Sequence, residues 1–170
     1  MKCSDNKFIF NCNLCNNEYK MNLNNIINNR WCNCTINKTE TKIYNWLTNN
    51  YNYTIIKQYY KLINNKRYYY DFYIQELNII LEIDGRQHFE QVKNWNSVEY
   101  TQNNDIIKMK YLIDNNISII RILQDDVWFD KNNWEINLRN YLKKYNKNTI
   151  IFIDNNENLY NKHKLLLNIK

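Results

Sequence analysis

The sequence predicts an α/β protein with a mixed β-sheet flanked by helices. Short runs rich in β-branched and aromatic residues are typical of strands, and they alternate with longer segments whose apolar residues recur at helical spacing. All five cysteines lie within the first 34 residues, which indicates a separate small module ahead of the α/β part. We therefore divide the chain into residues 1–36 and residues 37–170.

The first module contains the pattern C-x2-C-x16-C-x-C, formed by Cys12, Cys15, Cys32 and Cys34. Four thiolates in two knuckles can close a tetrahedral Zn²⁺ site of the ribbon type, and the metal supplies folding energy that so short a segment cannot gain by packing. The single residue inside the second pair is fewer than usual, so Cys3 stays open as an alternative ligand. The other interpretation is a set of reduced thiols without a structural role.

The helices and strands of the second part follow from local patterns. A helix begins at Asn37, an expected N-cap, with Glu40 at the third position of a capping box and apolar residues at helical spacing after it. Further along the chain we expect strands over 54–63, 67–74 and 77–84, a helix over 101–114, a strand over 117–123, a helix over 133–145, a strand over 149–153 and a helical tail.

Gly85 is the only glycine, and the chain has no proline. Asparagine tolerates left-handed backbone, so we expect it to occupy the turns and the positions of positive φ. A glycine kept at one place then indicates either positive φ or the close approach of another group. A tight turn at a strand end is the simpler interpretation. The carboxylates beside the glycine favour the other one, in which bare backbone lets a ligand phosphate approach.

Three carboxylates lie near this glycine. Glu82 and Asp84 are two residues apart in one strand, so they share a face, and like charges about 7 Å apart repel each other. Asp71 lies on the preceding strand, within an aromatic run where a lone charge is costly. A hard cation such as Mg²⁺ or Mn²⁺ would offset this repulsion, and it could also bind a phosphodiester oxygen and activate water.

The charge balance permits a polyanionic partner. The chain carries 23 Lys and Arg against 17 Asp and Glu, a net charge of +6, which suits DNA. No apolar run approaches the roughly 20 residues of a membrane helix, and the N-terminal residues lack a signal-peptide pattern. We expect a soluble intracellular protein with no membrane partner.

The run D-F-Y-I at Asp71, followed eleven positions after that residue by E-I-D-G-R-Q-H, resembles the core of the PD-(D/E)xK, restriction-endonuclease-like nucleases. A later D-x-x-K, at Asp105 and Lys108, and the strand that ends in I-I-R-I extend the resemblance. The most similar branch is that of the very-short-patch-repair-like endonucleases, which are often found behind a zinc ribbon in large DNA viruses and phages. The resemblance implies a restriction-endonuclease-like fold and a Mg²⁺-dependent DNA endonuclease, in the host cytoplasm or nucleus if the protein is viral. It also implies metal ligation by Asp71 and Glu82, with Glu40 reaching in from the first helix.

The chain departs from the family pattern at two positions. Tyr70 replaces the proline of the motif, and Asp84 stands where the lysine belongs. The positive charge at the site could then come from Lys108, from Arg86 or from a second metal held by Asp84.

Two polar residues after the glycine complete the expected site. The resemblance implies that His88 acts as a general base, and imidazole titrates in the range that this role needs. We interpret Gln87 as orienting water or phosphate. The structural alternatives are a His88 that caps the sheet edge, a Gln87 in a solvated turn and a Glu40 that serves only the capping box.

Three arginines are candidate DNA contacts, Arg30, Arg86 and Arg121, although Arg121 could equally be a cation at the edge of the core. The main alternative function is a DNA-binding or architectural protein that keeps the nuclease fold without catalysis. A zinc scaffold for protein partners is a third. One catalytic site usually nicks a single strand, so double-strand cleavage would indicate a homodimer.

Overall fold

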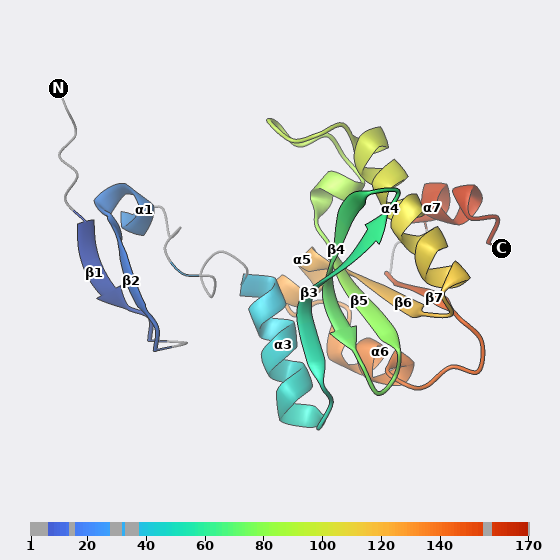
Figure 1. Cartoon of the computed structure of the whole chain (residues 1–170), viewed down its shortest axis with the longest axis horizontal. Helices are drawn as coiled ribbons and strands as arrows, with labels where there is room; N and C mark the ends of the chain where they lie inside the picture. The colour runs from blue at the N-terminus through green and yellow to red at the C-terminus, as the bar shows by residue number, and fades with distance from the viewer. Residues whose placement is uncertain (1–6, 14–15, 28–31, 33–37, 155–157, 170) are drawn as a thin grey trace.

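The computed structural model describes residues 7–13, 16–27, 32, 38–154 and 158–169 (Figure 1). Its main body is a five-stranded mixed sheet with helices on both faces, which confirms the α/β class and the mixed sheet expected from the sequence. No helix among these residues is both long and apolar enough to span a bilayer.

The described part of the N-terminal module is a small hairpin. Strands β1 (Lys7–Asn11) and β2 (Glu18–Asn22) pair antiparallel, and the short helix α1 (Leu23–Ile27) follows. This two-stranded sheet shares no strand with the larger sheet. Residue 37, the expected N-cap of the next helix, lies outside the described residues.

The larger sheet has the strand order β3-β4-β5-β6-β7. The first three strands are antiparallel and the last two join them in parallel, with the bounds β3 (Ile55–Ile63), β4 (Lys66–Ile74), β5 (Ile79–Asp84), β6 (Ser118–Leu123) and β7 (Ile150–Ile153). All five strands lie where the sequence predicts them.

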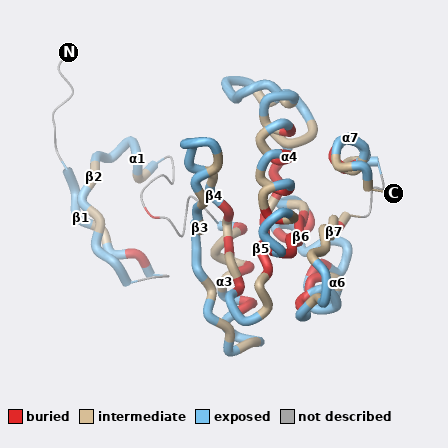
Figure 2. The backbone as a smooth tube through the Cα atoms, turned by 45° about the vertical axis from the view of Figure 1, so that its right-hand side comes forward, coloured by how far each residue is buried: buried red, intermediate tan, exposed pale blue. Residues whose placement is uncertain are grey.

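The helices cover the sheet in two sets (Figures 1 and 2). One face carries α3 (Lys38–Asn50), α5 (Gln124–Trp128) and α6 (Trp134–Tyr141), packed against side chains such as Phe72 and Ile120. The other carries α4 (Val98–Asp114), packed against Tyr70 and Ile80, with α7 (Asn161–Leu166) beside it. The short helix α5 follows β6 directly and has no counterpart among the predicted elements.

Asparagine takes most of the positions of positive φ, as expected. Eleven described residues other than glycine have positive φ, and nine of them are Asn. Gly85 has an ordinary extended conformation with φ of −78°, so positive φ does not account for it. A Cβ at this position would contact the side chain of Gln87 and would lie 2.7 Å from Oε1 of Gln124. An added methyl group would therefore have to displace the flexible ends of two glutamine side chains.

Candidate active site

The site lies where strands β4 and β5 separate. Their backbone pairing reaches Phe72 and Leu81 and goes no further toward the end of β5. Beyond it, side chains take the place of the ladder: Oδ2 of Asp71 accepts a hydrogen bond from the Ile83 amide at 2.7 Å, and Oε2 of Glu82 accepts one from the Asp71 amide at 3.4 Å. The break in the ladder brings the two carboxylates together.

The neighbouring strand is distorted at the same level. Gln58 in β3 has a φ of 49°, and it is skipped in the pairing of β3 with β4 opposite Asp71. Its side-chain amide donates to Oε2 of Glu40 at 3.2 Å. The irregular backbone of β3 thus holds the helix carboxylate beside the strand carboxylates.

A cavity of about 350 Å³ opens at this point. The sequence predicts seven catalytic residues, and six of them line this cavity: Glu40, Asp71, Glu82, Gln87, His88 and Lys108. They come from α3, β4, β5, the 3-10 turn Arg86–His88 and α4, so the fold assembles them from five separate elements.

The carboxylates of the cavity destabilise one another's charged forms. Burial raises the pKa of Asp71 well above its usual range, and the neighbouring charges of Glu82 and Glu40 add to the effect. Burial also raises the pKa of Glu40, partly offset by the hydrogen bond from Gln58. A positive charge placed among these groups would relieve the repulsion, and their oxygen atoms are the ligands that Mg²⁺ prefers.

The cavity does not present a complete metal centre. Within the described ranges, no group of three or more His, Cys, Asp or Glu side chains is arranged so that it could hold an ion. Asp71 and Glu82, linked through the Asp71 amide, are the residues that could hold one, with Glu40 at the cavity wall.

Lys108 supplies the positive charge that β5 itself lacks. It forms an ion pair with Oε1 of Glu82, and its Nζ lies 4.7 Å from the ring centroid of Tyr70. The cavity thus receives its lysine from α4. Tyr70 is fully buried beside this side chain.

Asp84 lies outside the carboxylate cavity. Its Oδ2 accepts hydrogen bonds from Nε of Arg121 at 2.7 Å and from the Tyr160 hydroxyl at 2.6 Å, and its Oδ1 accepts one from Nη2 of Arg121 at 2.6 Å. Alternation along β5 does place Asp84 on the same face as Glu82. The bidentate pairing nevertheless leaves it unsuited to ligate the same ion as Asp71 and Glu82, which corrects the expected ligand set.

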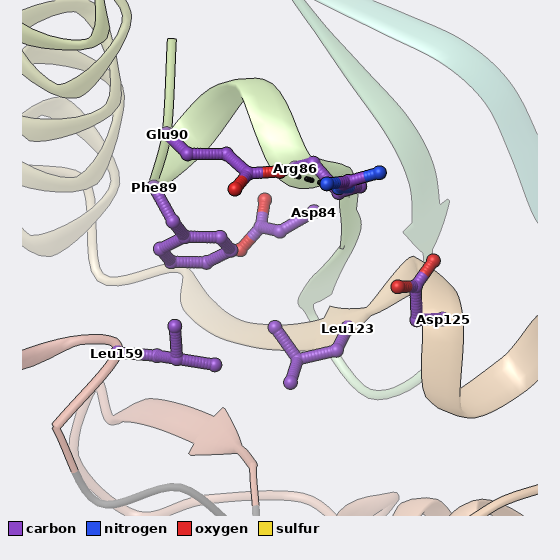
Figure 3. A pocket seen from close by; sticks show the side chains of 7 residues that line it. All are labelled: Asp84, Arg86, Phe89, Glu90, Leu123, Asp125 and Leu159. Atoms are coloured by element: carbon purple, nitrogen blue, oxygen red, sulfur yellow. Dashed lines mark hydrogen bonds and ion pairs between the residues drawn. The ribbon is translucent and has the colours of Figure 1, made fainter. Parts of the chain in front are cut away.

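Figure 3 shows the surroundings of Asp84, a second cavity of about 330 Å³. Its lining residues are Asp84, Arg86, Phe89, Glu90, Leu123, Asp125 and Leu159. Arg86 is exposed and paired with Glu90, so it stays accessible as a DNA contact. Arg30, another expected contact, lies outside the described residues.

Arg121 is a buried cation and not a phosphate contact. Its side chain is 0% exposed, and besides Asp84 it pairs with Asp105, whose Oδ1 lies 3.1 Å from Nη2. Of the two interpretations that the sequence allows, the structure favours the core cation. The expected contact of Arg121 with DNA is therefore wrong, because the guanidinium is buried in the core.

His88 lies between the carboxylate cavity, which it lines, and the buried cluster of Asp84, Asp105 and Arg121. Its Nδ1 lies 2.6 Å from Oδ2 of Asp105, and its Nε2 lies 3.8 Å from Oδ1 of Asp84. Burial opposes the charged imidazole, but the Asp84 carboxylate and the hydrogen bond to Asp105 outweigh it, so the pKa of His88 is raised above its usual value. A histidine held by a carboxylate and open to a cavity has the geometry of a general base.

Two members of the cluster come from the C-terminal segment, and sequence reasoning missed them. Nε2 of His163 lies 3.2 Å from Oδ2 of Asp105, and Tyr160 donates to Asp84. Both side chains are 0% exposed. The one available hint was that His163 is the second of only two histidines in the chain.

The N-terminal module contains two described cysteines, Cys12 and Cys32, and both are buried. Cys12 sits in a tight turn in which its amide donates to the Asn17 carbonyl at 2.9 Å and its carbonyl accepts from the Asn16 amide at 2.7 Å. Sγ of Cys32 donates to the Tyr19 hydroxyl at 3.2 Å. The remaining cysteines of the expected zinc site, Cys3, Cys15 and Cys34, lie outside the described residues.

Comparisons of the chain with protein-family models, with curated proteins and with solved structures found no match.

Proposed function

We propose that the protein is a metal-dependent DNA endonuclease that hydrolyses phosphodiester bonds at the cavity between β4, β5 and α4. The observation that carries the proposal is the convergence of Asp71, Glu82, Lys108 and His88 on one cavity. Two carboxylates, a lysine and a histidine held by a carboxylate are the groups that such a hydrolysis requires.

Asp71 and Glu82 would hold the cation, Mg²⁺ or Mn²⁺, with Glu40 beside them. A bound ion of this kind stabilises negative charge on the phosphate and lowers the pKa of a bound water. The donor set fits a hard cation because its atoms are carboxylate oxygens. The pKa of Asp71 is raised by burial and, in addition, by the charges of Glu82 and Glu40, and a cation would relieve that added repulsion.

The remaining residues have roles that follow from their positions. His88, in its neutral form, accepts the proton of the attacking water, and Asp105 fixes the orientation of the ring through Nδ1. Lys108 is placed to donate to a phosphate oxygen at the cavity, and Gln87 lines the same space. The positive net charge of the chain favours approach of the polyanion.

We also propose that the N-terminal module holds a structural Zn²⁺ through Cys12, Cys15, Cys32 and Cys34. Among the described residues of this module, Cys12 and Cys32 are the ones that are buried. This supports the proposal, because metal ligation replaces a hydrophobic core in so small a unit. Asn16 follows the first cysteine pair with a φ of 55°, so the chain turns back immediately after it.

One observation favours a second candidate, a DNA-binding protein of the same fold without catalysis. The ion pair between Lys108 and Glu82 already offsets one cavity carboxylate without any metal. In that case the cavity would be a structural ion-pair site, and DNA binding would not depend on divalent cations.

Cleavage of supercoiled plasmid and of mismatched or branched duplexes, in Mg²⁺, Mn²⁺ or EDTA, tests the proposal. Wild type should nick DNA only with a divalent cation, and Glu82→Gln and Lys108→Met should each lower the rate by about 100-fold or more. Lys110→Met is the matched control, since Lys110 is an exposed lysine on the same helix. DNA binding without cleavage of any substrate would favour the second candidate.

A further inference from the structure

The free end of the β3–β4 hairpin carries an uncovered row of aromatic, apolar and basic side chains. Tyr60 and Tyr69 face each other across the two strands, and their ring centroids are 5.9 Å apart. Leu62 and Arg67 form the next cross-strand pair on the same face, with the Arg67 guanidinium 5.3 Å from the centroid of the Tyr60 ring. Tyr60 and Tyr69 are each 50% exposed and Leu62 is 61% exposed.

The opposite face of the same hairpin is packed, so exposure is a property of one face alone. Tyr59 and Tyr70 pair across the strands and turn toward the core cluster under α4, where Tyr70 is fully buried. The exposed rings are therefore not a result of a generally loose hairpin.

This row is continuous with the candidate active site. Tyr69 lines the carboxylate cavity and stands two residues before Asp71 on β4. A ligand lying on the rings of Tyr60 and Tyr69 would reach the cavity directly. The row thus forms a surface that leads into the site.

The charge of the hairpin fits a polyanion. Residues 55–70 contain four basic side chains, Lys57, Lys61, Lys66 and Arg67, and no Asp or Glu. Lysines on an edge strand also discourage pairing with other chains, which is a sufficient reason for Lys57 and Lys61 on β3. That reason does not extend to a facing pair of exposed tyrosine rings, because apolar exposed surface works against solubility.

We propose that Tyr60, Tyr69 and Arg67 form a platform on which the bases of an unpaired DNA strand stack, so that its backbone runs into the carboxylate cavity. The proposal rests on the proposed nuclease function and names its substrate class, DNA with a single-stranded segment beside the cleaved phosphate. Stacking on aromatic rings needs an open base face, which single strands offer and continuous duplex does not. Arg67 stands beside the ring of Tyr60. Lys61 and Lys66 lie on the opposite face of the hairpin, so they add only a general attraction to the phosphates.

Binding measured in EDTA tests the platform without any contribution from cleavage. The probes are a fluorescently labelled oligothymidine strand and a blunt duplex, followed by fluorescence anisotropy at fixed salt. The double variant Tyr60→Ala/Tyr69→Ala should weaken single-strand binding about tenfold or more, since base stacking on each ring contributes substantially. Duplex binding should change by less than about twofold, because backbone contacts dominate it.

Two matched variants separate stacking from other effects. The double variant Tyr60→Phe/Tyr69→Phe keeps both rings and should bind the single strand within about twofold of wild type. Tyr141→Ala removes an exposed tyrosine of α6, outside the hairpin, and should have no effect. A 2-aminopurine base in the strand should be quenched on binding to wild type and to the Phe variant, but not to the Ala variant.

Three results would overturn the platform: wild type that does not bind the single strand, an Ala variant that binds it normally, or an Ala variant that loses duplex binding equally. The cleavage assay is read separately. Ring-dependent single-strand binding without metal-dependent cleavage would leave the platform standing and reject the nuclease. Metal-dependent cleavage together with unchanged single-strand binding by the Ala variant would support the nuclease and reject the platform.

Discussion

Arg121 holds both carboxylate oxygens of Asp84, with Nε 2.7 Å from Oδ2 and Nη2 2.6 Å from Oδ1. The pair is fully buried between two parallel strands, and the same guanidinium lies 3.1 Å from Oδ1 of Asp105. One cation thus offsets two buried carboxylates, and Asp105 in turn holds His88. The interior cluster therefore connects the stability of the sheet to the geometry of the cavity.

Replacing Arg121 with Met should destabilise the fold by about 3–5 kcal/mol, because it leaves Asp84 and Asp105 buried without their cation. Equilibrium unfolding in urea, followed by far-UV circular dichroism, measures the loss. Arg86→Met removes an exposed arginine and should change the free energy of unfolding by no more than about 0.5 kcal/mol. Similar urea midpoints for the two variants would mean that the buried pair contributes little.

Asp71→Asn should raise the Tm of the metal-free protein while it abolishes cleavage. The pKa of Asp71 is raised by burial and by the charges of Glu82 and Glu40. At pH values above this raised pKa, the ionised carboxylate therefore lowers the free energy of unfolding, whereas an uncharged amide would not. The amide oxygen can still accept the hydrogen bond from Ile83. Thermal unfolding in EDTA at neutral pH measures the difference, which should disappear at acidic pH, where Asp71 is protonated.

Addition of Mg²⁺ provides the control for this variant. A ligand that binds only the folded state raises Tm, so Mg²⁺ should stabilise wild type and leave Asp71→Asn nearly unchanged. If Asp71→Asn were less stable than wild type in EDTA, the carboxylates would not destabilise one another, and the proposed cation site would lose its support.

Asp105→Asn should move the acid limb of the cleavage rate to lower pH. As the proposed general base, His88 would act only when neutral. Burial lowers its pKa, but the charge of Asp84 and the hydrogen bond and charge of Asp105 outweigh this effect and raise it. The wild-type rate should therefore rise with pH through a value above 6.5, the ordinary pKa of histidine. Loss of the Asp105 charge lowers that pKa, so the neutral base forms earlier on the pH scale.

The measurement is the single-turnover rate across pH, beside a direct titration of His88 by NMR. A lower rate with an unmoved acid limb would show that Asp105 acts only in folding. Thermal unfolding of the variant at each pH ensures that the rates refer to folded protein.

The sequence predicts much of this arrangement because many of its features are local. Alternation along β5 places Glu82 and Asp84 on one face, and the helical period places Asp105 and Lys108 about one turn apart on α4. The partner of each carboxylate depends on non-local register. Arg121 lies beside Glu82 in the pairing of β5 with β6, and its side chain reaches Asp84 instead, which no local pattern specifies.

The C-terminal contribution is the other part that local reasoning could not supply. Tyr160 and His163 enter the cluster because α7 packs next to α4, a contact between distant segments of the chain. Gly85 shows the same limit: its isolation marks a special position, but the two glutamine side chains that an added Cβ would displace come from the 3-10 turn and α5.

Gly85→Ala should leave stability nearly unchanged and lower the cleavage rate. With φ at −78° the backbone accepts alanine, but the new methyl group would displace the side-chain ends of Gln87 and Gln124, which both line the carboxylate cavity. Unfolding in urea and the cleavage rate test the two halves. Gln87→Ala removes the side chain nearest to the added methyl group. In the double variant Gly85→Ala/Gln87→Ala, the methyl group should therefore lower the cleavage rate less than it does when Gln87 is present. Normal cleavage by Gly85→Ala would show that neither glutamine position matters.

The protein should contain one Zn²⁺ per chain when it is prepared without chelators, as measured by elemental analysis. Cys12→Ser should lose the metal, because replacement of one of four thiolates weakens a tetrahedral site strongly. The thermal transition of the five-stranded sheet should persist in that variant, since the β1–β2 hairpin shares no strand with it.

The variants Cys3→Ser and Cys34→Ser identify the fourth zinc ligand. We expect Cys3→Ser to keep its full zinc content and Cys34→Ser to lose zinc. The opposite result would make Cys3 the ligand in place of Cys34. Protein free of zinc with both hairpin and sheet folded would contradict the ribbon. The module, whose described residues bury only Cys12 and Cys32, would then be stable by packing alone.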